Sequence, residues 1–475
     1  MNPYLKNTLL PLCATLALTL PDFFAPSFAL AKTTSLSSLT AWHSQGDVEA
    51  SYLEKKGGNS PISITHASAL PFQVTSTQTI TAVPNGIYTL LAHVRSTGGQ
   101  RINQLEVQNE AGRMQAVPIP KVSAWFPIVI SGIDVTNGTL SISYITQSKG
   151  HTSSSIDDVQ LIKSSAMPYI KGVDASWLPA MEASHVQFND LNGKPTNAMT
   201  IFSKLGVQAM RIRLFVHPTN NPYNGWCTLK DDIALAKRAK ALGMKILLDF
   251  HYSDTWADPA HQATPVAWQN DTTIPRLAKT VYGYTVYVMK AFQQAGVTPT
   301  WVQIGNEINS GFLWPLGNVS EGFTGIAAFI NAGYDAVKKI SPTTKVIVHL
   351  ANGWDMSTFE WFFQSLQDAG GHWDICGMSV YPEANDYTSI VAQTKATIED
   401  MQTLFHKPSM IVETGFEASN PEEGTYFMQQ LSAATVEAGG LGIFYWEPES
   451  YQWNGYTKGA WNATTKEPLP FLWSY

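Results

Sequence analysis

Two different patterns of apolar and polar residues divide the chain near Pro168. From about Ala41 to Lys163, short alternating runs such as YTLLAHV, NQLEVQN and TLSISYI are separated by Pro-Asn-Gly, Gly-Gly and Asn-Gly turns. Alternation with a period of two between such turns is typical of β-strands. Strands at this spacing predict a small all-β sandwich over residues 32–164. The Ser-Ser-Ala-Met-Pro stretch that ends at Pro168 is the expected linker.

Beyond Pro168, apolar strand-like runs alternate with segments of helical periodicity. The helical segments, such as DDIALAKRAKALG and FTGIAAFINAGYDAVKKI, each close near Gly or Pro. This alternation predicts an α/β domain of βαβ units around a parallel sheet. The eight expected strands begin at Tyr169, Gln208, Lys245, Trp301, Lys345, Ile375, Ser409 and Leu441. Eight units in about 300 residues predict a (β/α)8 TIM barrel over residues 169–475. An open doubly wound sheet is the alternative, but no Gly-rich phosphate loop follows the first expected strand.

The first 31 residues have the organisation of an export signal. Lys6 precedes an apolar stretch from Leu9 to Leu20, and Ala29-Leu30-Ala31 is a small-x-small cleavage site. We therefore expect residues 1–31 to be a cleaved signal peptide and the mature protein to be secreted, either periplasmic or extracellular. The stretch is too short to span a bilayer, and no later run is long enough. Cys13 follows a Leu where lipoprotein processing requires a small residue, so we expect no lipid anchor.

Composition narrows the class of partner. A chain of 475 residues exceeds what one hydrophobic core usually organises, which agrees with two domains. The formal charge of -7 provides no basic field for nucleic acid or an anionic membrane. With 15 Trp and 18 Tyr the chain is rich in the aromatic faces on which sugars stack, although large cores also use these residues. We expect a neutral polysaccharide substrate and a monomeric protein.

The expected barrel strands end in polar side chains with unusual regularity. Active sites of TIM barrels lie at the carboxyl ends of the strands, so these side chains are expected to converge on one rim. Asn306 and Glu307, for example, follow the apolar run WVQI and Gly305. Any one of these residues is explained equally well as a hydrogen-bonded structural group, but their convergence is not. The candidates are Asp174, Arg211, Arg213, His251, Asn306, Glu307, His349, Tyr381, Glu413 and Trp446, with Asp249, Tyr252 and Glu447 beside them.

Glu307 and Glu413 end the fourth and seventh expected strands, which face each other across the barrel mouth. Opposed carboxylates predict glycoside hydrolysis, with retention at a separation of about 5–5.5 Å and inversion at about 6.5–9.5 Å. We expect the short separation. Apolar surroundings would keep Glu307 protonated as the acid, and Arg211 or Arg213 would keep Glu413 ionised as the nucleophile. Asn306 could bind the 2-hydroxyl of the sugar.

Several stretches resemble glycoside hydrolase family 53, the endo-β-1,4-galactanases. They are GVDAS at Gly172, RIRLFVHP at Arg211, LLDFHYSDTWADP at Leu247, QIGNEINSGFLWP at Gln303, SVYPE at Ser379 and IVETGF at Ile411. The resemblance covers about residues 169–475. It implies retaining hydrolysis of internal β-1,4-galactosidic bonds in pectic arabinogalactan, with Glu307 as acid/base and Glu413 as nucleophile.

The same resemblance implies which residues hold the sugar. His251, Asn306 and Tyr381 would line the central subsite, and Trp446 would form its floor. The two longest motifs add Trp256, Asp254 and Trp314 as substrate-binding candidates.

The predicted sandwich is also similar to a known class. Its opening WHSQGDVEASY and closing IDDVQLI resemble the galactose-binding-type jelly rolls found as carbohydrate-binding modules beside glycosidases. Trp42 and Trp125 are candidate platforms for a sugar ring, although a Trp in a sandwich is more often part of the core.

No cofactor or metal is expected. Some relatives bind calcium through an acidic loop between strands seven and eight, but here the connection from Phe416 to Thr425 is short and has no Asp-x-Asp ligand series. Cys227 and Cys376 are expected to be free, buried thiols, because their predicted positions make a disulfide bridge difficult.

Two other function classes are compatible with parts of this pattern. A mannanase, xylanase or glucanase of the same clan would carry the same two Glu residues in a different cleft. A non-catalytic binding protein would combine the sandwich with a degenerate barrel, but the retention of Glu307, Glu413, Asn306 and both Arg residues argues against degeneration.

Overall fold

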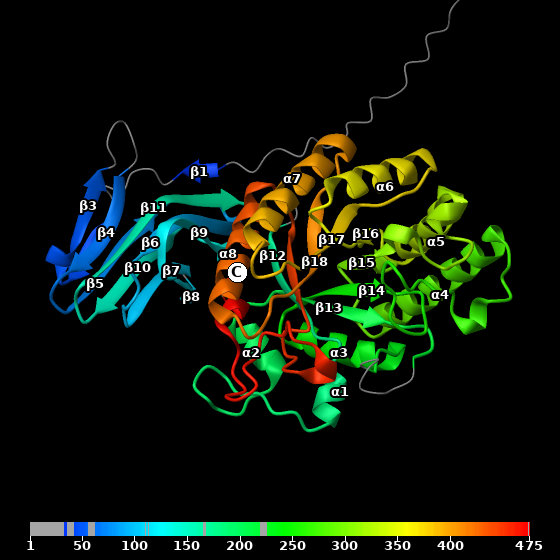
Figure 1. The fold of residues 1–475 in the computed structure, drawn as a ribbon, viewed down its shortest axis with the longest axis horizontal. Coiled ribbons are helices and arrows are strands. Elements are labelled where there is room, and N and C mark those ends of the chain that lie inside the picture. Colours follow the sequence, from blue (N-terminus) through cyan, green and yellow to red (C-terminus); the bar gives the residue numbers. More distant parts are fainter. Residues whose placement is uncertain are drawn as a thin grey trace, which may run out of the picture.

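The computed structural model describes residues 33–35, 42–55, 62–109, 111–112, 114–164, 168–218, 226–473 and 475. It has two parts, an all-β sandwich and an α/β barrel, which lie side by side in Figure 1. The signal peptide predicted for residues 1–31 lies outside the described residues. Within the described ranges, no helix combines the length and the apolar character that crossing a membrane requires.

The sandwich consists of two antiparallel sheets, as expected. The first has the order β3 (Ser51–Lys55), β4 (Ile62–Ser68), β11 (Thr152–Lys163), β6 (Gly86–Ser96) and β9 (Val122–Val135), with β1 (Thr33–Ser35) added along β11. The second has the order β2 (His43–Gly46), β5 (Phe72–Ile80), β10 (Leu140–Ser148), β7 (Ile102–Asn109) and β8 (Met114–Pro118). Alternate residues of β10, including Leu140, Ile142 and Tyr144, are buried between the sheets, which is the period-two pattern of the sequence.

The two Trp residues proposed as sugar platforms already have protein neighbours. Trp42 is half-buried against the sandwich core. The guanidinium of Arg95 lies over the ring of Trp125, 4.8 Å from its centre. A role in sugar binding stays a prediction for both.

The barrel is closed and all its strands are parallel. The strands are β12 (Ile170–Asp174), β13 (Ala209–Leu214), β14 (Lys245–Phe250), β15 (Trp301–Ile304), β16 (Lys345–Leu350), β17 (Ile375–Val380), β18 (Ser409–Thr414) and β19 (Gly442–Trp446). Closure is direct, because β12 pairs with both β13 and β19. All eight expected strands are confirmed, and closure excludes the open doubly wound sheet.

Helices cover the outside of the barrel (Figure 1). They are α1 (Leu178–Ala183), α2 (Ala198–Lys204), α3 (Leu229–Ala241), α4 (Ile274–Gln294), α5 (Phe323–Ile340), α6 (Met356–Asp368), α7 (Tyr387–Phe405) and α8 (Pro421–Glu437). In α4 the buried residues Leu277, Val281, Val288 and Phe292 recur at helical spacing, which gives this helix its core-facing stripe.

The barrel interior is apolar at the amino ends of the strands and polar at the carboxyl ends. A cluster that includes Ile170, Leu247 and Trp301 fills the interior at the amino ends of the strands. Gly172 leaves room for the Phe444 ring, which a Cβ at that position would approach to 2.4 Å. Two residues further along the same strand, Asp174 enters the polar layer. The apolar layer therefore supports the polar layer from below and excludes water from its base.

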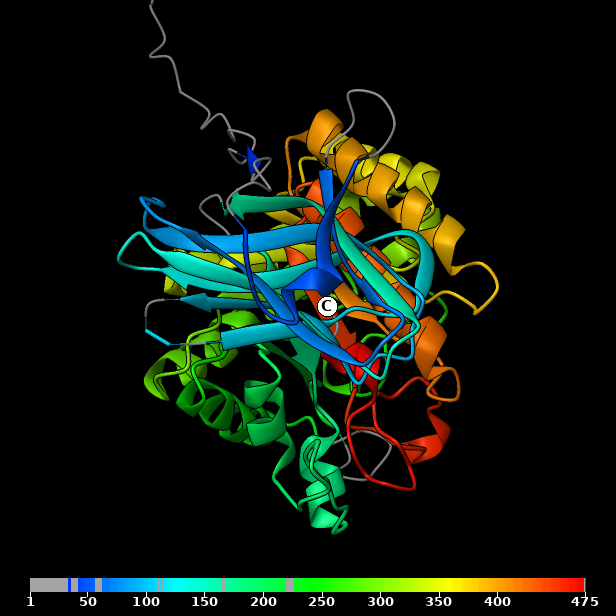
Figure 2. The ribbon, with the colours of Figure 1, turned by 90° about the vertical axis from the view of Figure 1, so that its left-hand side faces the viewer.

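The sandwich packs against the barrel through α8, and Figure 2 shows both sheets in front of the barrel. Ala433 of α8 contacts the buried Leu91 and Val129 of the sandwich. Nearby, the Tyr426 hydroxyl donates to the Lys121 carbonyl at 2.6 Å. Away from this seam, Cys227 and Cys376 are both buried and free, as expected.

Candidate active site

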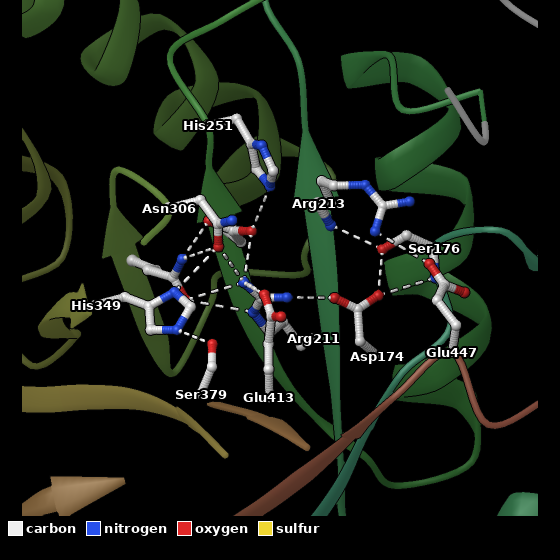
Figure 3. A network of polar contacts seen from close by, with 12 residues as sticks. Asp174, Ser176, Arg211, Arg213, His251, Asn306, His349, Ser379, Glu413 and Glu447 are labelled. Carbon is white, nitrogen blue, oxygen red and sulfur yellow. Dashed lines mark hydrogen bonds and ion pairs between the residues drawn. The ribbon is translucent and has the colours of Figure 1, made fainter. Parts of the chain in front are cut away.

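The guanidinium of Arg211 lies at the centre of the polar layer (Figure 3). It forms ion pairs with Asp174 at 2.6 Å, Asp249 at 2.8 Å and Glu413 at 2.8 Å. Burial opposes the charge of this group, but these three carboxylates raise the pKa of Arg211 above its ordinary value. A permanent positive charge is therefore fixed beside Glu413.

Glu413, on β18, has two polar partners from different strands, one by ion pairing and one by hydrogen bonding. Arg211 contacts its Oε1, and the Tyr381 hydroxyl donates to its Oε2 at 3.0 Å. The side chain remains slightly exposed, with 7% of its residue surface accessible. A carboxylate held by a cation and a hydroxyl, with one side open, has the environment of a nucleophile.

Glu307 follows β15 in a left-handed backbone conformation, with φ 46 and ψ 52. This conformation is strained for a residue with a side chain. The preceding Gly305 has φ +80, and a Cβ there would lie 2.7 Å from Ile308. The Ser379 hydroxyl donates to Glu307 Oε1 at 2.6 Å. The turn therefore directs Glu307 toward Ser379 on β17.

The environments of the two Glu residues separate their chemistry. Burial raises the pKa of Glu307, and the Ser379 hydrogen bond opposes this only in part. Burial also raises the pKa of Glu413, to about 8. Arg211 opposes this rise, and the negative charge of Glu307 adds to it. Such a pair titrates as a unit. Because the ion pair and the Tyr381 bond both favour an ionised Glu413, we place the shared proton on Glu307.

Asn306 is oriented by a set of buried donors. Its Oδ1 accepts from Arg211 at 2.9 Å and from Gln303 Nε2 at 3.0 Å. Its Nδ2 donates to the Ala257 carbonyl at 2.8 Å. The Nδ1 atom of His349 lies 3.0 Å from the same Oδ1, and its Nε2 lies 2.8 Å from the Ser379 hydroxyl. Because Ser379 donates to Glu307, His349 Nε2 donates to the Ser379 hydroxyl, and Nδ1 lies beside Asn306 without donating to it.

His251 and Asp249 form a second oriented pair beside Arg211. The Ala257 backbone N–H donates to His251 Nδ1 at 3.1 Å, so Nε2 carries the proton and faces Asp249 at 3.0 Å. Burial raises the pKa of the Asp249 carboxyl, but Arg211 and His251 outweigh it and the net shift is downward. Burial lowers the pKa of His251, although Asp249 opposes the shift. A neutral imidazole is therefore held at the edge of the layer.

Arg213 is not beside Glu413. It points instead toward β19, where it pairs with Glu447 at 3.0 Å and lies 4.2 Å from the centre of the Trp256 ring. Trp177 and Trp446 also lie beside it, and these two rings pack edge to face with each other and with Tyr456. Of the two Arg residues that the sequence offered as the partner of Glu413, the structure selects Arg211.

Four predicted substrate-binding side chains have no exposed surface. Asp174, Arg211, Arg213 and His349 are each 0% exposed. Their ion pairs and hydrogen bonds orient other groups of the layer, and contact with the sugar stays a prediction for all four. His251 and Asn306, at 2% and 5%, and Glu413 lie at the accessible edge, and Tyr381 and Trp446 are half-buried.

Of the other candidates, Trp256 lies beside Arg213, and Asp254 and Trp314 stabilise loops. Asp254 accepts from the backbone N–H groups of His217 at 3.0 Å and Val266 at 2.9 Å. The indole N–H of Trp314 donates to the Ser310 carbonyl at 3.1 Å. Contact with substrate stays a prediction for all three residues.

Several residues of this layer were absent from the sequence-derived site. Ser379 donates to Glu307, and Gln303 donates to Asp249 at 2.6 Å. Gln262 donates to the Asn306 carbonyl at 2.7 Å, which holds the β15 turn. Gln303 and Ser379 were detectable as polar residues at inward-facing positions of otherwise apolar strands. No sequence pattern marks Gln262, which lies in a loop.

Within the described residues, no group of three or more His, Cys, Asp or Glu side chains is arranged to hold a metal ion. The layer offers a proton donor, a nucleophile and neutral hydrogen-bonding groups. This set can perform acid/base and nucleophilic chemistry at an acetal carbon.

The known proteins that resemble this chain belong to one family. A sequence profile described as Glycosyl hydrolase family 53 matches residues 170–432. The "Arabinogalactan endo-beta-1,4-galactanase" of Thermothelomyces thermophilus is 35% identical over 302 residues, which cover 58% of this chain and 89% of that protein. A protein of the same name, with suffix A, from Aspergillus niger is 35% identical over 312 residues and covers 61% and 87%.

Solved structures agree with this result. A structure from a study of two fungal β-1,4-galactanases superposes with a TM-score of 0.59 at 31% identity, covering 65% of this chain and 99% of that one. The GH53 catalytic domain of Ignisphaera aggregans superposes with a TM-score of 0.58 at 29% identity, covering 64% and 95%.

Proposed function

The chain belongs to glycosyl hydrolase family 53, and we propose that it is an endo-β-1,4-galactanase that hydrolyses internal β-1,4-galactosidic bonds with retention. The galactanase names of the relatives support the substrate. We further propose that the protein is exported, on the basis of residues 1–31, and that it acts as a monomer on the galactan of pectic arabinogalactan.

The observation that carries the proposal is the unequal partnering of two carboxyl groups in one layer. Glu413 pairs with a buried cation, and Glu307 pairs with a neutral hydroxyl. The same residue type is thereby given two protonation states at one pH. Double displacement at a sugar requires this division of roles.

In the first step, Glu413 Oε attacks the anomeric carbon while Glu307 donates its proton to the departing glycosidic oxygen. The bond from the anomeric carbon to that oxygen breaks, and a covalent glycosyl-enzyme forms. Glu307, now ionised, then removes a proton from water as the water attacks the same carbon. Glu413 leaves as a carboxylate, and two inversions give net retention. Arg211 stabilises the carboxylate at the start and at the end of this cycle.

The direct test is release of reducing ends from β-1,4-galactan by the full chain, with mannan, xylan and β-glucan as competing substrates. We expect galactan to be preferred, and Glu413→Gln and Glu307→Gln to reduce hydrolysis at least about a thousandfold. Glu437→Gln, at the exposed end of α8, is the matched control. Preference for another polysaccharide would change the proposed substrate but not the proposed reaction. Full activity of Glu413→Gln would refute the mechanism.

Rescue of inactive variants by azide distinguishes the nucleophile from the acid/base residue. In Glu413→Gly, azide can replace the missing nucleophile by direct attack, which gives the glycosyl azide of inverted configuration. In Glu307→Gly, azide attacks the glycosyl-enzyme and gives the retained configuration, provided the substrate has a good leaving group. Proton NMR of the products distinguishes the two anomers, and the opposite outcome would exchange the assigned roles.

A further inference from the structure

A second cleft lies between the sandwich and the barrel, away from the carboxyl ends of the strands. Its volume is about 420 Å³, which is in the range of small-molecule sites. The sandwich contributes parts of β7, β8 and β9, and the barrel contributes β12, the end of α2 and the chain end. In Figure 1 the C-terminus lies between the two parts, beside α8 and β12. The active-site residues do not line this cleft.

Lys171 provides a buried amine in the cleft wall. It lies on β12, faces outward from the barrel and is only 4% exposed. No ion pair joins it to a carboxylate of the described residues, and its Nζ lies 4.6 Å from the centre of the Tyr475 ring. Burial lowers the pKa of Lys171 to about 7. An ammonium group buried without an anion is costly, so a bound anion would be stabilised there.

The lining has the charge pattern of an anion site. Lys171 and the exposed Lys204 line it, and no acidic side chain does, although the chain as a whole has a formal charge of -7. Positive charge beside a buried amine, with no acidic side chain in the lining, favours an anionic ligand.

Neutral groups of the lining suit a sugar. Trp473 is half-buried, and with Tyr475 it presents aromatic surface to the cleft. The Gln115 amide donates to the Ser131 carbonyl at 3.1 Å, which leaves its own carbonyl oxygen to accept from a hydroxyl. Aromatic faces and amide carbonyls are groups that contact sugar rings and their hydroxyls.

From these observations we propose that the interdomain cleft binds a carboxylate-bearing sugar, a uronate residue, with its carboxylate paired to Lys171. The site is separate from the hydrolytic centre and does not depend on the proposed galactanase activity. It would hold an acidic part of a polysaccharide while the barrel acts on a neutral part.

The test is isothermal titration calorimetry of the full chain with D-galacturonate, D-galactose and acetate. We expect saturable binding of galacturonate and at least tenfold weaker binding of galactose and of acetate. Lys171→Met should weaken galacturonate at least tenfold, and Lys204→Met should weaken it less. Hydrolysis of galactan should be unchanged in both variants.

A blocking variant and a spectroscopic readout guard against a folding defect. Ala116→Trp places a bulky side chain in the cleft from the exposed edge strand β8 and should also abolish binding, with an unchanged melting temperature. When the protein is labelled with 13C at lysine Cε, the Lys171 resonance is assigned as the one that is absent from Lys171→Met. The pKa of Lys171 that this resonance reports should rise when galacturonate binds. Equal binding of galactose, equal binding of acetate, unchanged binding in Lys171→Met, or no binding would each overturn the proposal.

Discussion

Glu413 Oε1 lies 2.8 Å from a guanidinium nitrogen of Arg211 that has no access to solvent. The same guanidinium also holds Asp174 and Asp249. The charge that stabilises the proposed nucleophile is therefore shared with two carboxylates that take no part in bond breaking. Changes at Arg211 will affect both catalysis and folding.

Replacement of Arg211 separates these two effects. Arg211→Lys keeps the charge but loses the planar arrangement of donors, so we expect kcat/KM to fall about 10²–10³-fold with a smaller loss of stability. Arg211→Met leaves three buried carboxylates without a cation and should cost about 3–5 kcal/mol. Galactan hydrolysis and thermal unfolding measure the two quantities. Wild-type stability of Arg211→Met would show that the buried ion pairs are not needed for folding.

Ser379→Ala should alter the pH dependence of the reaction. The Ser379 hydrogen bond favours the ionised form of Glu307, so its loss raises the pKa of the proposed acid. The alkaline limb of kcat/KM, which reports that acid in the free enzyme, should move upward by about one pH unit. Ser357→Ala, at the exposed start of α6, is the control. A downward shift would mean that Glu307 is not the group that limits activity at high pH.

Glu449→Gln should stabilise the protein at neutral pH. Glu449 is 0% exposed, and burial and the neighbouring Glu447 raise its pKa well above the ordinary value. A carboxyl group whose folded pKa is raised contributes stability below about pH 4.5 and loses it as pH rises toward the folded pKa. The variant should therefore melt above the wild type at pH 7.5, by about 2–4 °C for each kcal/mol, and close to it at pH 4.

The matched control for this change is Glu437→Gln, since Glu437 is exposed. It should leave the melting temperature unchanged at both pH values. A lower melting temperature of Glu449→Gln at pH 7.5 would show that the ionised Glu449 is stabilised by a partner that outweighs its burial.

Chelation should leave the protein unchanged. Glu417 in the connection after β18 accepts from Thr457 at 3.1 Å and pairs with Lys458 at 3.1 Å. The Glu422 carboxylate lies 2.7 Å from the Tyr426 hydroxyl. Carboxylates with such partners have little need for a cation. We expect the same melting temperature with and without EDTA, and a fall that added calcium reverses would reveal a structural calcium site.

The sequence located the barrel well because buried parallel strands are nearly continuous apolar runs. Each begins within one residue of its expected position. Glu307 and Glu413 were found because both follow such runs. The partner of Glu413 could not be chosen from the sequence, since Arg211 and Arg213 lie two residues apart on one strand and both point inward. Only their contacts with residues of the neighbouring strands distinguish the two Arg residues.

The burial and the contacts of other site residues had no signal in a linear pattern, even where the residue itself could be detected. The buried positions of Asp174 and His349 follow from how closely eight strands pack, so a polar residue at a strand end is not necessarily open to substrate. Ser379 is a small residue in an apolar strand and gives little indication of its contact with Glu307. The interdomain seam depends on residues hundreds of positions apart, such as Leu91 and Ala433.

Helix α8 belongs to both parts of the molecule. Its inner side closes the barrel between β18 and β19, and Ala433 and Tyr426 on the other side bind the sandwich. The sandwich is therefore not a module tethered by a loose linker, and a barrel cut free at Pro168 would expose an apolar strip of α8 to water. Such a fragment should self-associate, whereas the intact chain should tumble and sediment as one rigid particle.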